Sequence, residues 1–144
     1  MPITTCIFDA YGTLFDVAAA ARMAAEEPGR EAFAEHWPQI AEHWRLKQLQ
    51  YSWLRAVMGQ HCDFWEVTKD GLDWALEASG LEGDDTLRTR LLQLYRELAA
   101  YPEVPDMLAT LRARGMQCAI LSNGSPEMLD AAVQSAGIGA MLDD

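Results

Sequence analysis

Hydrophobic residues along the chain follow two patterns, short continuous runs and longer stretches with helical spacing. Residues 3–8 and 116–121 form the two short runs, and each ends in polar residues. Apolar runs of this length predict buried β-strands. In open parallel α/β sheets, ligands bind at the carboxyl ends of the strands. The sequence therefore directs attention to Asp9 and to Ser122, which follow these two runs.

Nearly all of the chain between the two runs has helical spacing. Predicted helices cover residues 18–25, 31–58 with an interruption near Pro38, 69–79, 87–100 and 105–114. Thr68 is predicted to cap the third of these helices. After the second run, Ser125 is predicted to cap a last helix that Gly137 ends.

The order of the predicted elements indicates an α/β fold with a parallel sheet and an insertion. The helical block from about residue 16 to residue 100 is too long for an ordinary crossover between parallel strands. We therefore expect residues 1–15 and 101–144 to form the core, and residues 16–100 to form an inserted helical cap.

The composition of the chain argues against several classes of protein. The 144 residues carry a formal net charge of −11, which argues against nucleic-acid binding because that function needs clustered Lys and Arg. Cys6, Cys62 and Cys118 lie far apart, so neither a disulfide framework nor a zinc site is expected. The cysteines, the absence of a signal-peptide pattern and the lack of a long apolar run favour a cytoplasmic protein without a membrane helix.

The segment FDAYGTLFDV, residues 8–17, carries the candidate chemistry. Asp9 follows the first predicted strand, Gly12 permits a tight backbone course, and Thr13 brings a hydroxyl close to the carboxylate. A carboxylate held in this way can act as a nucleophile and form an ester. The alternative interpretation is an aspartate that merely ends a strand and caps a turn.

Three separated segments, in this order, resemble the L-2-haloacid dehalogenases of the haloacid dehalogenase superfamily. They are FDAYGTLFDV, the stretch WRLKQLQYSWLR at residues 44–55, and AILSNGSP at residues 119–126, and the Tyr101-Pro102 junction fits as well. Most phosphatases of the superfamily have a second aspartate at the position of Tyr11. The tyrosine therefore favours the dehalogenase branch.

The resemblance implies a Rossmann-like core and a reaction that needs neither metal nor cofactor. Asp9 would displace halide from a short L-2-haloacid, and water would hydrolyse the ester to a 2-hydroxy acid of inverted configuration. A haloacid carries one negative charge and the attacked carbon is neutral, so a carboxylate can approach that carbon without a cation between them. The departing halide needs no proton, so no general acid is required. A small-molecule phosphatase of the same superfamily is the enzymatic alternative.

Arg45 is the second candidate for chemistry. Its default interpretation is a surface arginine on an amphipathic helix, yet it adjoins Trp44 and lies one turn from Leu49. A weakly hydrated guanidinium beside apolar residues suits a halide or carboxylate site. By resemblance, Arg45 helps bind substrate and accepts the halide. We expect Lys47 and Arg55 to be solvated or structural.

The remaining site residues rest mainly on the resemblance. Ser122 and Asn123 would bind the substrate carboxylate and orient Asp9, beside a helix N-terminus that favours anions; the alternative is a capping turn. The resemblance implies a catalytic set of Asp9, Thr13, Arg45, Ser122 and Asn123, and a substrate-binding set of Ala10, Tyr11, Arg45, Leu49, Phe64, Ser122 and Asn123, with Trp65 as a further wall residue. Leu46 falls where some relatives have a polar residue, which bears on substrate preference.

His36, His43 and His61 have no acidic or cysteine partners at ligand spacing, so we expect surface or hydrogen-bonded histidines.

The family pattern continues past Asp144 with a Lys, a Ser-Ser-Asn segment and an Asp. We therefore expect a truncated dehalogenase that is stabilised by a partner chain or that lacks full activity. The resemblance alone implies a homodimer. The non-enzymatic alternative is a fragment that only folds or associates.

Overall fold

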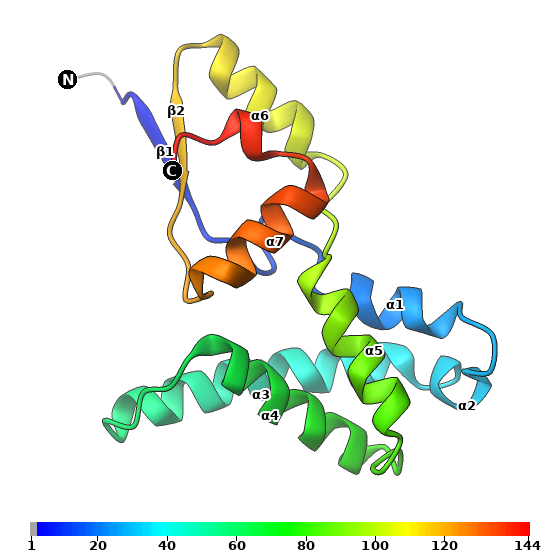
Figure 1. Cartoon of the computed structure of the whole chain (residues 1–144). Helices are drawn as coiled ribbons and strands as arrows, with labels where there is room; N and C mark the ends of the chain where they lie inside the picture. Colours follow the sequence, from blue (N-terminus) through cyan, green and yellow to red (C-terminus); the bar gives the residue numbers. More distant parts are fainter. Residues whose placement is uncertain (1–2) are drawn as a thin grey trace. The chain divides into compact units, whose positions relative to one another are not determined.

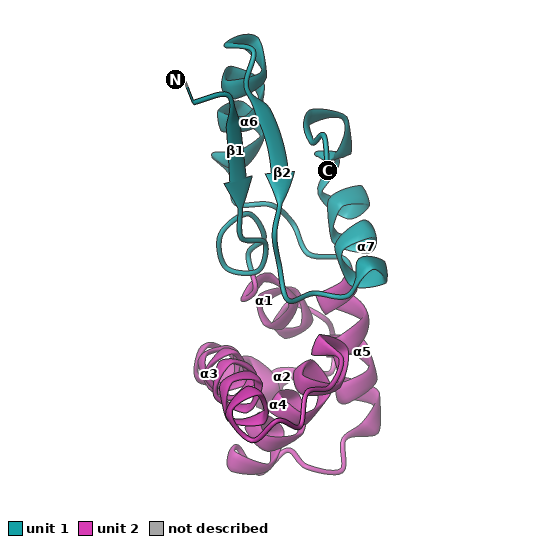
Figure 2. Ribbon diagram, turned by 90° about the vertical axis from the view of Figure 1, so that its left-hand side faces the viewer, with its two compact units in different colours: residues 1–16, 97–144 teal, residues 17–96 magenta. Residues whose placement is uncertain are grey.

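The computed structural model describes residues 3–144, which divide into two compact units (Figure 1, Figure 2). Unit 1 comprises residues 1–16 and 97–144, and unit 2 comprises residues 17–96. Unit 1 contains β1 (Thr5–Phe8), α6 (Val104–Ala113), β2 (Gln117–Ile120), α7 (Pro126–Ala136) and the 3-10 helix η1 (Gly139–Met141). Unit 2 contains α1 (Ala19–Ala25), α2 (Glu31–Ala34), α3 (Trp37–Val57), α4 (Phe64–Ala78) and α5 (Asp85–Arg96).

The sheet of unit 1 joins β1 and β2 in parallel, with Phe8 opposite Ile120. This arrangement confirms the α/β fold and the parallel pairing. The two strands are shorter than the apolar runs that predicted them. Even so, the ladder continues past β2, because the Leu121 amide donates to the Phe8 carbonyl at 2.8 Å. Both strands therefore end side by side, and the loops that follow them leave from the same edge.

The two faces of the sheet differ in burial, as alternation along strands requires. Cys118 is fully buried, and α6 packs against β2. On the other face Ile7 and Leu121 are 64% and 74% exposed. The other edge of β2 is paired with the end of the chain. There, the Asp143 amide donates to the Cys118 carbonyl at 2.7 Å, and the Ile120 amide donates to the Asp144 carbonyl at 2.9 Å.

The helix after β2 begins and ends as predicted. Ser125 is the N-cap of α7, and its hydroxyl accepts a hydrogen bond from the Met128 amide at 3.4 Å. Pro126 occupies the first turn of α7. Backbone amides in the first turn have no acceptor within the helix, so the lack of an amide proton on proline costs no hydrogen bond there. Gly137 ends the helix with φ +68°, a conformation that glycine adopts at little cost.

The predicted start of the middle helix is wrong. Helix α4 begins at Phe64, capped by Asp63, whose carboxylate accepts from the Trp65 amide at 2.7 Å. Thr68 lies inside the helix and is fully buried. Its hydroxyl donates to the Phe64 carbonyl at 2.8 Å, the bond to the preceding turn that a helical threonine commonly makes.

The predicted interruption of the stretch 31–58 near Pro38 is confirmed, because the stretch forms two helices, α2 and α3, and Pro38 lies in the first turn of α3. The predicted end of the helix over residues 87–100 needs adjustment. Helix α5 ends at Arg96, although helical spacing continues to residue 100. Residues 99–101 pair instead with the chain after Asp9. The Asp16 amide donates to the Ala99 carbonyl, and the Tyr101 amide donates to the Leu14 carbonyl, both at 2.9 Å.

Each unit has its own apolar interior. In unit 1 it contains Leu14, Phe15, Leu98, Val104, Leu108, Met128 and Ile138. In unit 2 helices α3 and α4 pack along each other, and α1 packs against α5. The interior of unit 2 contains Phe33, Ile40, Trp44, Leu72, Leu76, Leu87, Leu91 and Leu94. The pairing of α3 with α4 matters for the site, because it buries the polar groups that surround Arg45.

Candidate active site

The loop after β1 holds Asp9 at the carboxyl end of the strand. Its turn is organised by the buried Ala10, whose carbonyl accepts amide hydrogen bonds from Thr13, Leu14 and Phe15 at 3.2, 2.9 and 3.0 Å. Gly12 has φ +86°, which a residue with a side chain rarely adopts. The glycine predicted to permit a tight course is therefore used for that purpose.

Asp9 and Thr13 are joined directly. The Thr13 hydroxyl donates to Oδ2 of Asp9 at 2.8 Å, and both residues are exposed to solvent. A hydrogen bond to a carboxylate is stronger than one between neutral groups, and it restricts the rotation of the side chain. The arrangement presents an accessible carboxylate in a defined orientation, as nucleophilic attack requires.

The loop after β2 lies beside the loop of Asp9. A Cβ atom on Gly124 would lie 2.8 Å from Cε2 of Tyr11, so the tyrosine ring rests directly on this glycine. Tyr11 is 3% exposed and also packs against Phe15, with ring centroids 6.0 Å apart. Tyr11 therefore acts as a buried spacer between the two loops and offers no carboxylate.

Ser122 and Asn123 occupy the turn between β2 and α7. The Ser122 hydroxyl accepts from the Gly124 amide at 3.1 Å, so the capping-turn interpretation describes the serine correctly. Ser122 is half-buried and Asn123 is exposed. The hydroxyl proton of Ser122 and the amide of Asn123 are donors, and both lie next to the N-terminus of α7. Donors beside a helix N-terminus suit an anionic group.

Arg45 lies on α3 in unit 2 and is half-buried. Its Nη1 donates to Oε1 of Gln48 at 2.9 Å, three residues along the helix. Leu49 is half-buried one turn from Arg45, and Leu46 is 47% exposed. Phe64 is 7% exposed at the start of α4. These predicted site residues all belong to the paired helices α3 and α4.

A buried hydrogen-bond network surrounds Gln48, which is 1% exposed. Its Nε2 donates to Oγ1 of Thr68 at 2.8 Å and to the Tyr95 hydroxyl at 3.0 Å. Because the Thr68 hydroxyl donates to the Phe64 carbonyl, a chain of hydrogen bonds runs from Arg45 to Phe64. Sequence reasoning did not single out Gln48. Its position could have drawn notice, because Gln48 shares the buried face of α3 with Ile40 and Trp44, where an apolar residue is usual.

Tyr95 is buried together with this network, which is therefore shielded from water. Burial raises the pKa of the Tyr95 phenol to about 12, against the opposing effects of the Gln48 hydrogen bond and the Arg45 charge. Its ring packs on Trp44, with centroids 4.9 Å apart, and the Trp44 indole donates to the Thr68 carbonyl at 2.8 Å. Electrostatic interactions are stronger in such a water-poor environment than in solvent.

The other cations and histidines of unit 2 have different surroundings. Arg55 forms an ion pair with Asp70 at 2.5 Å, and Lys47 lies over the Trp74 ring at 4.1 Å, as structural residues would. The prediction that the histidines are exposed or hydrogen-bonded is wrong for His43. Within residues 3–144, its buried Nδ1 has no hydrogen-bond partner, and its ring packs edge-on against Trp74.

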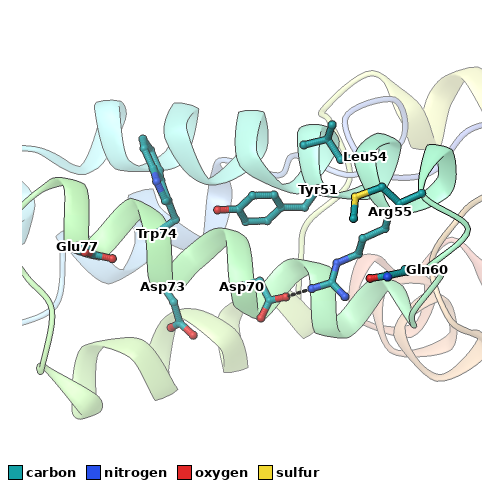
Figure 3. A pocket seen from close by; sticks show the side chains of 9 residues that line it. Tyr51, Leu54, Arg55, Gln60, Asp70, Asp73, Trp74 and Glu77 are labelled. Atoms are coloured by element: carbon teal, nitrogen blue, oxygen red, sulfur yellow. Dashed lines mark hydrogen bonds and ion pairs between the residues drawn. The ribbon is translucent and has the colours of Figure 1, made fainter.

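A cavity of about 570 Å³ lies between α3 and α4, and no predicted site residue is among those that line it (Figure 3). Tyr51, Leu54 and Arg55 line it from α3, and Asp70, Asp73 and Glu77 line it from α4. Three carboxylates oppose the entry of an anion. This cavity is therefore a poor site for a haloacid.

Among residues 3–144, no group of three or more His, Cys, Asp or Glu side chains is arranged to hold a metal ion. The three cysteines are free thiols. No helix in this part of the chain has the length and apolar character needed to cross a bilayer.

A family model of haloacid dehalogenase-like hydrolases matches residues 3–144. The chain is 44% identical to (S)-2-haloacid dehalogenase 1 of Pseudomonas sp. strain CBS-3, covering 99% of this chain and 60% of that protein. It is 43% identical to (S)-2-haloacid dehalogenase 4A of Burkholderia cepacia, covering 98% and 59%. The chain thus spans about 60% of the length of these curated relatives.

The fold also resembles solved dehalogenases. It superposes with a TM-score of 0.82 on the L-2-haloacid dehalogenase of Xanthobacter autotrophicus with chloropropionic acid covalently bound. The two are 43% identical, and the match covers 99% of this chain and 55% of that one. With the family model matching over nearly the whole length, the chain belongs to the haloacid dehalogenase-like hydrolases.

Proposed function

We propose that the protein is an (S)-2-haloacid dehalogenase, which converts short L-2-haloalkanoic acids into (R)-2-hydroxy acids and halide. The observation that carries the proposal is the exposed Asp9 carboxylate, oriented by Thr13 at the end of β1, with a buried tyrosine two residues later. Curated (S)-2-haloacid dehalogenases at 43–44% identity support it. A relative with covalently bound chloropropionic acid supports the covalent route.

In the first step, an oxygen of Asp9 attacks the halogen-bearing carbon from the side opposite the halogen. A carbon–oxygen bond forms, and the carbon–halogen bond breaks with its electron pair leaving on halide. Attack from the back inverts the configuration. Thr13 engages Oδ2, so Oδ1 is the oxygen assigned to the attack. The halide leaves without a proton, which is why a tyrosine at position 11 suffices.

In the second step, water attacks the carbonyl carbon of the Asp9 ester. The ester bond to Asp9 breaks on the carbonyl side, the hydroxy acid leaves, and the Asp9 carboxylate is restored. The oxygen of the product hydroxyl therefore derives from Asp9, and the oxygen from water stays on Asp9.

The other predicted residues bind the substrate in this proposal. Ser122 and Asn123 donate hydrogen bonds to the substrate carboxylate, supported by the N-terminus of α7. Arg45, held on α3 in unit 2, accepts the halide. Leu49 is half-buried and supplies apolar surface. Ala10, Tyr11 and Phe64 are buried, and their proposed part is the apolar packing behind the binding surface. Unit 1 is proposed as the catalytic core and unit 2 as the cap.

The reaction as proposed uses no metal ion. A cytoplasmic location is proposed because all three thiols are free, which fits a reducing compartment. A homodimer is proposed on the resemblance alone.

A halide-release assay with both enantiomers of 2-chloropropionate tests the activity. We expect release from the (S) enantiomer only, and none from the D9N variant. Release from neither enantiomer by the folded protein contradicts the proposal. Magnesium-dependent release of phosphate from small phosphate esters would point to the phosphatase alternative instead.

A further inference from the structure

We propose that Gln48 is a positioning residue for Arg45, which it holds ready for an anion through the buried network of Thr68 and Tyr95. This inference rests on the proposed function, because it concerns the residue that is to bind the halide. It adds a residue that contacts neither the nucleophile nor the substrate, and that acts through the orientation of a guanidinium.

The hydrogen-bond pattern fixes which end of the Gln48 amide faces Arg45. The single hydroxyl proton of Thr68 is donated to the Phe64 carbonyl at 2.8 Å. Towards Gln48, Thr68 can therefore only accept, so the NH₂ group of Gln48 must face it, as the 2.8 Å contact shows. The amide oxygen is then left to face Nη1 of Arg45, at 2.9 Å. The opposite orientation would set two acceptors against each other at Thr68 and two donors against each other at Arg45.

The side chain of Gln48 is held rigidly. It is 1% exposed, Thr68 is 0% exposed, and Tyr95 is 3% exposed. The Tyr95 hydroxyl lies 3.0 Å from Nε2 and 3.3 Å from Oε1 of Gln48, so it contacts both ends of the amide. Partners on α4 and α5 thus fix a residue of α3, and a hydrogen bond from a fixed acceptor restricts the rotamers of a long arginine side chain.

The kind of acceptor also suits the task. An amide oxygen accepts a hydrogen bond without carrying a negative charge, so it orients the guanidinium and leaves its positive charge undiminished. A carboxylate at the same place would orient Arg45 equally well but would compete with an incoming halide or carboxylate. A buried glutamine is costly unless its polar atoms are hydrogen-bonded, and here each polar atom has a partner.

A double-mutant cycle tests the proposal on the full chain. The Q48M variant keeps the length of the side chain and removes its hydrogen bonds. We expect Q48M to lower kcat/KM for (S)-2-chloropropionate roughly 10- to 100-fold, because a small misplacement of a binding group is costly. In the R45K background the same change should matter less than about twofold, since residues that act through one another are not additive. Q50M, a half-buried change on the same helix, is the matched control and should leave kcat/KM unchanged.

A milder variant guards against misfolding of Q48M. Y95F removes only the hydroxyl that contacts Gln48, and we expect a severalfold loss of kcat/KM that again disappears in the R45K background. Equal losses in both backgrounds would mean that Gln48 and Tyr95 serve only the stability of unit 2. That result, or full activity of a folded Q48M, overturns the proposal.

A readout without activity separates this proposal from the proposed function. The Nε–H signal of Arg45 in ¹⁵N NMR spectra is identified by its loss in R45K. We expect its order parameter to fall in Q48M and to stay unchanged in Q50M. If the wild-type chain releases no halide, the proposed function fails, and this signal alone decides. An Arg45 signal that is equally ordered in Q48M and wild type overturns the positioning role.

Discussion

The Thr13 hydroxyl donates a 2.8 Å hydrogen bond to Oδ2 of Asp9 across a turn of four residues. The turn that makes this contact possible depends on the Ala10 carbonyl and on the positive φ of Gly12. The orientation of the proposed nucleophile is thus encoded within seven consecutive residues, 9–15.

Replacing Thr13 with valine tests that contact. The change keeps the shape of the side chain and removes the hydroxyl that orients the Asp9 carboxylate. We expect T13V to lower the rate of halide release roughly 10- to 100-fold, because misplacement of a reacting group is costly. The free energy of unfolding should change little, because both side chains are exposed. The control is T110V, which removes an exposed hydroxyl that donates to the Asp106 carbonyl on α6. Equal rates in T13V and T110V would remove Thr13 from the mechanism.

Enlarging Gly124 tests the contact between the two loops. The Cβ of alanine would lie 2.8 Å from the Tyr11 ring and 3.2 Å from Leu129. Overpacking of this kind costs about 1–3 kcal/mol, which denaturant unfolding of G124A should reveal. G139A is the matched comparison, because its Cβ would meet only Val133, at 3.3 Å. A G124A variant as stable as G139A would show that Tyr11 and Gly124 are not tightly packed.

Because Tyr95 is buried, we expect the free energy of unfolding to fall in alkali. Its pKa is raised by burial from 10.0 to about 12 in the folded protein. The contribution of the neutral phenol is therefore complete below pH 10 and is lost as the pH rises through about 12. A shift of this size corresponds to about 3 kcal/mol. The unfolding free energy of the wild type should fall faster than that of Y95F across this range.

The comparison variant for the alkaline experiment is Y51F, which removes the ring hydroxyl of a half-buried tyrosine beside Lys47. Parallel curves for wild type and Y95F would contradict the burial of Tyr95.

Because Asp143 is ion-paired, we expect the free energy of unfolding to fall in acid as well. The Arg112 guanidinium, followed by the Cys118 amide, lowers the pKa of the Asp143 carboxyl. Stabilisation by this carboxylate is therefore present above the ordinary aspartate pKa of about 4 and is lost as the pH falls through the lowered value. D143N should lose less stability than wild type on acidification. The control is D130N, at an exposed position on α7, and an acid dependence of D143N identical to wild type would contradict the ion pair.

Features with strong local signals could be predicted from the sequence. The cap of α7 needs only Ser125, Pro126 and Gly137, all within one segment. The β1 loop likewise carries Gly12 and Thr13 next to Asp9. The parallel sheet followed from two apolar runs separated by a long helical block, because such strands require a crossover.

Features set by distant partners could not be predicted in this way. Helical spacing continues through residues 97–100, yet Ala99 pairs with Asp16, so tertiary pairing overrides the local pattern. Thr68 looked like a cap because hydroxyls favour caps, but Asp63 had the same preference and lies where the helix begins. Gln48 was overlooked because its partners Thr68 and Tyr95 are 20 and 47 residues away.

The most direct test of the central claim is a search for the ester on Asp9. The protein is mixed with (S)-2-chloropropionate, quenched in acid and digested, and its peptides are weighed by mass spectrometry. We predict that the peptide containing Asp9 gains the mass of the substrate residue without its halogen, and that the D9N variant and the (R) enantiomer give no gain. Halide release by a protein whose Asp9 peptide remains unmodified, or a substrate residue found on a different side chain, would contradict the role of Asp9 as the nucleophile.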